Sequence, residues 1–100
     1  MCGIVGYIGP RDAAEVILAG LYRLEYRGYD SAGIALSSGR DVSILRAQGA
    51  VAKLEEKLEQ HHHGKTMGMG HTRWATHGPP SEKNSHPHAS YNEKVYLVHN

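Results

Sequence analysis

The spacing of apolar positions predicts a strand followed by a helix at the start of the chain. Residues 3–8 (GIVGYI) are rich in β-branched and aromatic residues and end at the turn-forming pair Gly9-Pro10. Residues 12–27 then place their apolar side chains three and four positions apart, as on one face of a helix. Asp12, three residues before a glutamate, predicts the helix start, and Gly28 predicts its end.

The rest of the chain alternates strand-like runs with polar turns and one further helix. We expect strands at 31–38, 41–49, 66–74 and 94–100, an amphipathic helix at 51–58, a polar loop at 61–65 and a long irregular segment at 76–92. Helices mixed with hairpin-like strand pairs are typical of the α+β class, with a largely antiparallel sheet. The pattern shows no internal repeat and no linker between domains.

Composition narrows the class of protein. The chain has 100 residues, 11 Lys and Arg against 10 Asp and Glu, and a formal charge of +1, so it lacks the basic surface that nucleic acid requires. No segment approaches the roughly twenty apolar residues of a membrane helix. One cysteine cannot form an internal disulfide, which is consistent with a reducing compartment. We therefore expect a soluble, cytoplasmic, single-domain protein.

The one cysteine lies beside the initiating methionine, and its position suggests chemistry. Cysteine is small enough to allow removal of Met1, which would leave Cys2 with a free α-amine. Such an amine has an ordinary pKa of about 7.7 to 8, so it can accept a proton near neutral pH. A terminal residue then supplies both nucleophile and base. The simpler interpretation is a small buried hydrophobic residue.

The segment HTRWATHG offers groups that would hold a polar substrate. Arg73 carries a planar fork of donors that matches a carboxylate, although an arginine at a strand end is often only a surface charge. Thr76 and His77 follow it and can donate hydrogen bonds. Asn100, after the last strand-like run, can offer its amide to an oxyanion, although asparagine there is often a turn former.

Four separated blocks together resemble one enzyme family: MCGIVGYIG, LEYRGYDSAGIAL, HTRWATHGPPSEKNSHPH and VYLVHN. They are similar to the N-terminal glutaminase domain of the glutamine:fructose-6-phosphate aminotransferases (isomerizing), which are class II glutamine amidotransferases of the N-terminal-nucleophile hydrolase superfamily. The terminal Cys-Gly-Ile alone would fit any class II amidotransferase. The resemblance implies a four-layer α-β-β-α sandwich, of which residues 1–100 would form the N-terminal part.

The resemblance also implies a role for each matching residue. Cys2 would attack the side-chain amide of glutamine, its own amine would act as the base, and the thioester would then be hydrolysed. The remaining implied roles are carboxylate binding by Arg73, further glutamine contacts by Thr76 and His77, the mouth of the ammonia passage at Trp74, an oxyanion donor at Asn100 and support of the nucleophile by Arg27. No cofactor and no metal are implied.

The same resemblance predicts what this stretch of chain lacks. In the family, a glycine after the asparagine supplies the second oxyanion donor, an acidic residue further on binds the substrate amine, and two sugar-isomerase domains transfer ammonia to fructose 6-phosphate. Loss of one oxyanion donor alone costs about a hundredfold or more in turnover. We therefore expect little glutaminase activity from residues 1–100 alone. The resemblance also implies a homodimer for the full-length enzyme.

Two alternatives from other classes remain open at this stage. Eight histidines, among them the run at 61–63 and the pair His86 and His88, suggest a metal-binding module, although no spacing matches a structural zinc site. A non-catalytic interaction segment is compatible with the Gly-Pro turns and the tyrosines. Labelling of Cys2 by a glutamine-like electrophile would favour the glutaminase over both.

Overall fold

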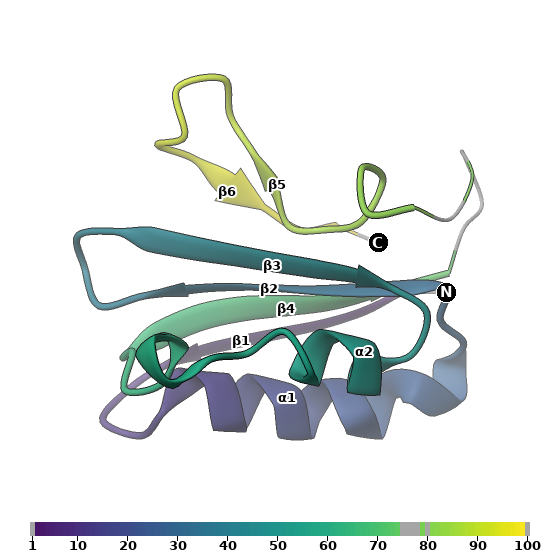
Figure 1. Cartoon of the computed structure of the whole chain (residues 1–100), viewed down its shortest axis with the longest axis horizontal. Coiled ribbons are helices and arrows are strands. Elements are labelled where there is room, and N and C mark those ends of the chain that lie inside the picture. Colours follow the sequence, from purple (N-terminus) through teal and green to yellow (C-terminus); the bar gives the residue numbers. More distant parts are fainter. Residues whose placement is uncertain (1, 75–78, 80, 100) are drawn as a thin grey trace.

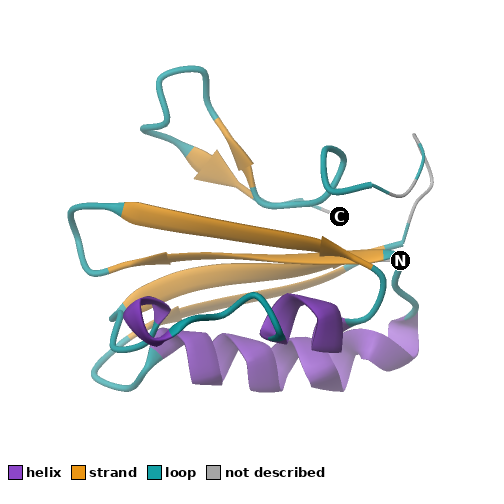
Figure 2. Ribbon diagram, viewed as in Figure 1, coloured by secondary structure: helices purple, strands orange, loops and turns teal. Residues whose placement is uncertain are grey.

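A four-stranded antiparallel sheet carries helices on one face and a small hairpin over the other (Figures 1 and 2). The structure is a computed structural model and describes residues 2–74, 79 and 81–99. Its elements are β1 (Gly3–Ile8), α1 (Ala13–Leu24), the 3₁₀ turn η1 (Glu25–Arg27), β2 (Ser31–Ser37), β3 (Val42–Gln48), α2 (Val51–Glu55), the 3₁₀ turn η2 (Gln60–His62), β4 (Met67–Arg73), β5 (His88–Ala89) and β6 (Tyr96–Leu97).

The strand order is β1-β4-β2-β3, so β4 lies between β1 and β2 although it comes last of the four in the chain. Each neighbouring pair is antiparallel. Consequently the start of β1, the end of β4 and the start of β2 lie together at one end of the sheet. Cys2, the first described residue, directly precedes β1 at this same end.

The core lies between the sheet and α1. Ile17 and Leu21 of α1 are fully buried against Ile34 and Leu36 of β2. A methyl group added at Gly70 of β4 would come within 2.4 Å of Ile17 Cγ2, so the helix packs directly on the strand backbone. We call this the helix face of the sheet.

The opposite face of the sheet carries the alternate residues of each strand, because successive side chains of a strand point to opposite sides. On β1 these residues include Ile4 and Ile8, which are exposed. On β2, by contrast, both faces are buried, because the segment before β5 lies over this second face. We call the face of the sheet opposite the helix face the outer face.

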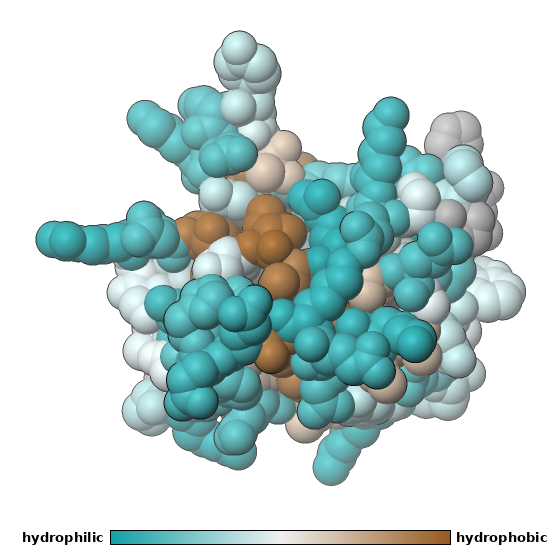
Figure 3. All heavy atoms as spheres, viewed as in Figure 1, coloured by the Kyte–Doolittle hydropathy of each residue, from teal (hydrophilic) through white to brown (hydrophobic). Residues whose placement is uncertain are grey.

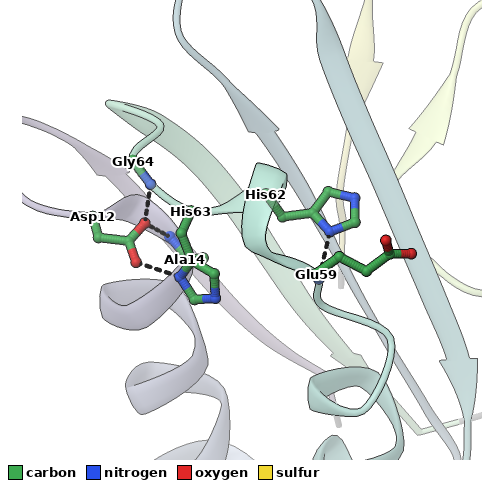
Figure 4. A network of polar contacts seen from close by, with 6 residues as sticks. All are labelled: Asp12, Ala14, Glu59, His62, His63 and Gly64. Carbon is green, nitrogen blue, oxygen red and sulfur yellow. Dashed lines mark hydrogen bonds and ion pairs between the residues drawn. The ribbon is translucent and has the colours of Figure 1, made fainter.

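Asp12 starts α1 and also fastens the loop that follows η2 (Figure 4). Its carboxylate accepts a hydrogen bond from Ala14 N at 3.3 Å and from Gly64 N at 3.0 Å, and its Oδ2 lies 2.6 Å from Nδ1 of His63. Burial alone would raise the pKa of Asp12, but these hydrogen bonds and the His63 charge outweigh it and lower that pKa. The predicted helix cap is therefore confirmed, with a tertiary partner.

Other expected elements differ in detail from the sequence prediction. The helix expected at 51–58 ends at Glu55, and β5 lies within the segment 76–92 that was expected to be irregular. Residues 60–62 form the turn η2, which overlaps the start of the polar loop expected at 61–65. In this turn His62 is buried, and its Nδ1 accepts a hydrogen bond from Glu59 N. Among the described residues of the last strand expected at 94–100, only Tyr96 and Leu97 pair in a sheet. Within the described ranges, no helix is long and apolar enough to cross a membrane.

Candidate functional site

Cys2 lies at the end of the sheet where three strands meet. It directly precedes Gly3, which is opposite Thr72 of β4, so Cys2 lies beside Arg73, the last residue of that strand. Gly3 belongs to the helix face, since a methyl group there would meet Leu24 at 2.7 Å and Thr72 Oγ1 at 2.8 Å. The alternation along the strands therefore puts Cys2 and Arg73 on the outer face. Cys2 is half-buried.

Arg73 is a buried residue and not a surface charge, with only 7% of its surface exposed. It lies opposite Ser31 of β2 and donates a hydrogen bond from Nη1 to the carbonyl of Pro79 at 3.2 Å. The same Nη1 lies 4.0 Å from a carboxylate oxygen of Asp30. A guanidinium held in this way presents its planar fork in a defined orientation, as recognition of a carboxylate requires.

The loop after η1 closes this end of the sheet. Asp30 N donates to the carbonyl of Arg73 at 2.6 Å, which extends the β2–β4 pairing by one bond. Gly28 has a φ of +100°, and a methyl group there would come within 3.1 Å of the Trp74 ring. The loop that follows Arg27 therefore packs on Trp74, whose indole is half exposed. The structure thus brings together the regions of Cys2, Arg73, Trp74 and Arg27.

Three of the residues expected at the site, Thr76, His77 and Asn100, lie outside the described residues, as does Met1. Their expected roles stay predictions. His99, which directly precedes Asn100, is described, and its backbone carbonyl lies 2.7 Å from Nε2 of His71. The described chain therefore reaches the outer face of β4 one residue before Asn100.

Four histidines gather on the outer face next to Arg73. The ring of His86 stacks on that of His71 with centroids 4.1 Å apart, and it also contacts the rings of His88 at 4.3 Å and His99 at 4.6 Å. Burial, followed by the charges of the neighbouring histidines and of Arg73, lowers the pKa of His86 to about 3. Burial is also the main cause that lowers the pKa of His71 and of His88.

Acid is expected to destabilise the protein through this cluster. The unfolded chain binds a proton at His86 below its ordinary pKa of 6.5, whereas the folded chain resists protonation down to a pH of about 3. Stability is therefore complete above pH 6.5 and falls as the pH drops from 6.5 toward 3. The urea concentration at the unfolding midpoint should therefore be lower at pH 5 than at pH 7.5. Asp12 does not titrate over this range, since its pKa lies below 3.8. An unchanged midpoint over that range would contradict the buried neutral cluster.

The chain is similar to known proteins over its whole length. The chain is 55% identical over 100 residues to the glutamine--fructose-6-phosphate aminotransferase [isomerizing] of Shouchella clausii, 54% to that of Caldanaerobacter subterraneus and 52% to that of a Synechocystis species. Each match covers the entire chain. The chain belongs to this aminotransferase family. It spans 16% of the length of these curated relatives and corresponds to their N-terminal part.

A solved structure of another glutamine amidotransferase has a similar fold over most of the chain. The glutamine phosphoribosylpyrophosphate amidotransferase of B. subtilis, complexed with ADP and GMP, matches 92% of this chain and 20% of its own, with a TM-score of 0.74 and 26% identity. The resemblance and the α+β class expected from the sequence are confirmed, including the N-terminal-nucleophile hydrolase type of fold. No protein-family model matches the chain.

Two hollows in the surface lie away from Cys2 and Arg73. A cavity of about 280 Å³ with a mainly apolar lining includes Ile8, Met67 and Tyr96, at the far end of the sheet. A larger one of about 510 Å³ is lined by β3 and by charged residues, among them Lys57 and Glu82. Figure 3 shows apolar side chains gathered in the middle of this side of the molecule with hydrophilic ones around them. Neither hollow borders the family's expected nucleophile.

The metal-binding alternative has no counterpart in the described part of the chain. There, no group of three or more histidine, cysteine, aspartate or glutamate side chains is arranged to hold a metal ion. The run 61–63 is divided between separate tasks, since His62 caps η2 and His63 contacts Asp12 (Figure 4). The rings of His71, His88 and His99 each contact the ring of His86.

Sequence reasoning missed the structural importance of Asp30, His71 and His86. Asp30 belongs to the EYRGYD block and stands directly before a predicted strand, which is a signal that could have placed it at a strand end. The two histidines are separated by 15 positions in the sequence and give no periodic signal. Only the folding of the segment before β5 onto β4 brings them together.

Proposed function

We propose that residues 1–100 form the N-terminal part of a glutaminase domain, in which Cys2 is the nucleophile and glutamine the substrate. The observation that carries this proposal is the placement of Cys2 beside the buried Arg73, on one face and at one end of the sheet. The names of the curated relatives, which are glutamine-dependent aminotransferases, support it.

The chemistry follows from a thiol and an amine on the same residue. After removal of Met1, the α-amine of Cys2 takes the thiol proton, and the sulfur attacks the side-chain carbonyl carbon of glutamine. The tetrahedral intermediate collapses as the carbon–nitrogen bond breaks, and the ammonium of Cys2 returns the proton to the departing ammonia. Water then hydrolyses the glutamyl thioester and releases glutamate and the thiol.

Arg73 would bind the α-carboxylate of glutamine and so determine which amide reaches the sulfur. Its guanidinium is buried, and it is oriented by the Pro79 carbonyl and the Asp30 carboxylate. Low exposure strengthens a charge-assisted hydrogen bond, because water competes less for the donors. A carboxylate anchored here leaves the far end of a glutamine side chain free to approach the neighbouring Cys2.

The remaining roles are parts of the same proposal. Thr76 and His77 would contact glutamine, Asn100 would stabilise the oxyanion, Trp74 would border the ammonia path and Arg27 would support the nucleophile. In the full-length, cytoplasmic enzyme the ammonia would pass to fructose 6-phosphate on sugar-isomerase domains that lie outside residues 1–100. The homodimer stays a prediction. The 55% identity to the fructose-6-phosphate enzymes, against 26% to the phosphoribosylpyrophosphate amidotransferase, favours this acceptor over that of another class II enzyme.

Replacing Arg73 by lysine should weaken recognition of glutamine without removing the thiol. Lysine keeps the charge but loses the two-pronged contact, so labelling of Cys2 by an electrophilic ketone analogue of glutamine should slow by about 10- to 100-fold. Labelling by a haloacetamide, which has no α-carboxylate, should not change. Intact-mass spectrometry against time measures both rates.

Arg46→Lys is the matched control for this experiment. Arg46 also lies on the outer face and donates to a proline carbonyl, that of Pro87, at 3.0 Å, but it belongs to β3 at the edge farthest from β1. Its variant should label with the ketone within about threefold of the wild-type rate, as expected for a residue with no substrate contact. Equal ketone rates for Arg73→Lys and the wild-type chain would overturn the proposed carboxylate site.

A further inference from the structure

The side chain of His71, on β4, is hydrogen-bonded to the backbone of His99, the residue just before Asn100. It lies on the outer face two residues before Arg73, opposite Ile4 of β1 and Gly33 of β2. The side chain is fully buried. Its Nε2 is 2.7 Å from the carbonyl oxygen of His99, 28 positions further along the chain. The contact therefore ties the last described residue to the strand that ends at Arg73.

The partner atom determines which nitrogen of His71 carries the proton. A backbone carbonyl only accepts hydrogen bonds, so Nε2 must be the donor. Within the described ranges, Nδ1 of His71 is buried without a hydrogen-bond partner, as expected for the bare nitrogen of a neutral ring. Burial lowers the pKa of His71, which keeps the ring neutral at physiological pH. The single N–H of the ring is thus committed to His99.

The ring itself is held in place from its other side. His86 stacks on it with an interplanar angle of 22°, and the carbonyl of His86 lies so close to Gly33 that a methyl group there would be 1.6 Å from the oxygen. The imidazole is therefore fixed between β4 and the segment before β5. A donor on a fixed ring can define the position of the backbone that it binds.

We propose that His71 is a positioning residue, whose Nε2–H holds the His99 carbonyl and thereby fixes the backbone that directly precedes Asn100. The inference rests on the proposed function, in which Asn100 stabilises the oxyanion. An oxyanion donor acts only within hydrogen-bond distance of the developing charge, and its loss costs about 10²- to 10³-fold in rate. Release of the His99 carbonyl should therefore slow the step that forms an oxyanion, and no other.

Two substitutions separate the donor from the ring. His71→Gln places an amide N–H near the position of Nε2 and keeps the donor, whereas His71→Phe keeps a ring to stack on His86 and loses the donor. His62→Phe is the control, since His62 is also buried and hydrogen-bonded to backbone but belongs to η2. Melting curves of all three variants report folding.

The two labelling reagents distinguish positioning from general disruption. The ketone analogue of glutamine forms an oxyanion when Cys2 attacks it, whereas a haloacetamide is displaced without one. We expect His71→Phe to label with the ketone at least about tenfold more slowly than the wild-type chain, and His71→Gln and His62→Phe within about threefold of it. Haloacetamide rates should match in all four chains. Unchanged ketone labelling of His71→Phe, equal slowing in His71→Gln, or parallel slowing with haloacetamide would each overturn the proposal.

A measurement on the wild-type chain covers the case in which His71→Phe does not fold. The ¹⁵N chemical shifts of the His71 ring should show the tautomer protonated at Nε2, and the tautomer protonated at Nδ1 would overturn the proposal. This readout is independent of chemistry at Cys2. If the ketone labels the wild-type chain no faster than chains that lack Arg73, the proposed glutaminase is refuted. In that case the tautomer of His71 still decides whether its ring holds the His99 carbonyl.

Discussion

Cys2→Ala is expected to abolish covalent capture of the ketone analogue of glutamine. The reaction requires a sulfur at this position, and no other cysteine exists in the chain to replace it. Removal of the nucleophile from a well-studied serine protease lowers turnover by about 10⁶-fold, and an effect of that order would leave no detectable adduct here. Intact-mass spectrometry after prolonged incubation measures the result.

Two further chains test why the cysteine must be terminal. Cys2→Ser keeps a nucleophile and the α-amine, so slow capture is expected, because a hydroxyl is far less nucleophilic than a thiol at neutral pH. A chain with one additional residue retained ahead of Cys2 keeps the thiol but converts the amine into a peptide nitrogen, which cannot act as a base. Capture by this extended chain at the wild-type rate would contradict the role of the amine, and an adduct on Cys2→Ala would contradict the nucleophile.

Gly33→Ala is expected to detach the segment before β5 from the sheet. The added methyl group would lie 1.6 Å from the His86 carbonyl oxygen and 2.8 Å from its carbon. Both are backbone atoms, so no side-chain rotation relieves the overlap. Overpacking of this kind costs about 1–3 kcal/mol or more, which corresponds to roughly 10 °C in melting temperature for a domain of this size.

Gly6→Ala is the matched control for Gly33→Ala. Gly6 lies on β1 of the same sheet, and a methyl group there meets nothing within 4 Å among the described residues. Its melting temperature should stay within a few degrees of that of the wild-type chain, since surface substitutions usually change stability by about 0.5 kcal/mol or less. Of the two variants, only Gly33→Ala should lose the contact between the rings of His71 and His86. Ring-proton NMR detects this loss. Equal melting of the two variants would contradict the close contact.

Local patterns predicted most of the sheet and the first helix. The strand at the N-terminus, the hairpin of β2 and β3 and the helix capped by Asp12 each depend on neighbours in the sequence, through alternation, turn residues and capping. The last strand was predicted too long. A strand must pair to be a strand, and among the described residues from 94 to 99 only Tyr96 and Leu97 pair, with β5.

The proposed site shows a similar division between residue type and position. A terminal thiol and an arginine before a loop could be picked out from the sequence because their chemistry is distinctive. Their adjacency could not, since it depends on the insertion of β4 between β1 and β2. The burial of Arg73 likewise arises from Pro79 and Asp30, which approach it from different loops.

The sequence by itself determined the family, the order of most elements and the residues able to perform amide chemistry, because identity and local spacing are properties of the chain. Only the tertiary structure decided that Cys2 and Arg73 share one end and one face of the sheet, and that His71 holds the backbone before Asn100. These contacts join residues 28 to 71 positions apart. Their geometry is set by sheet register and burial, which no local pattern specifies.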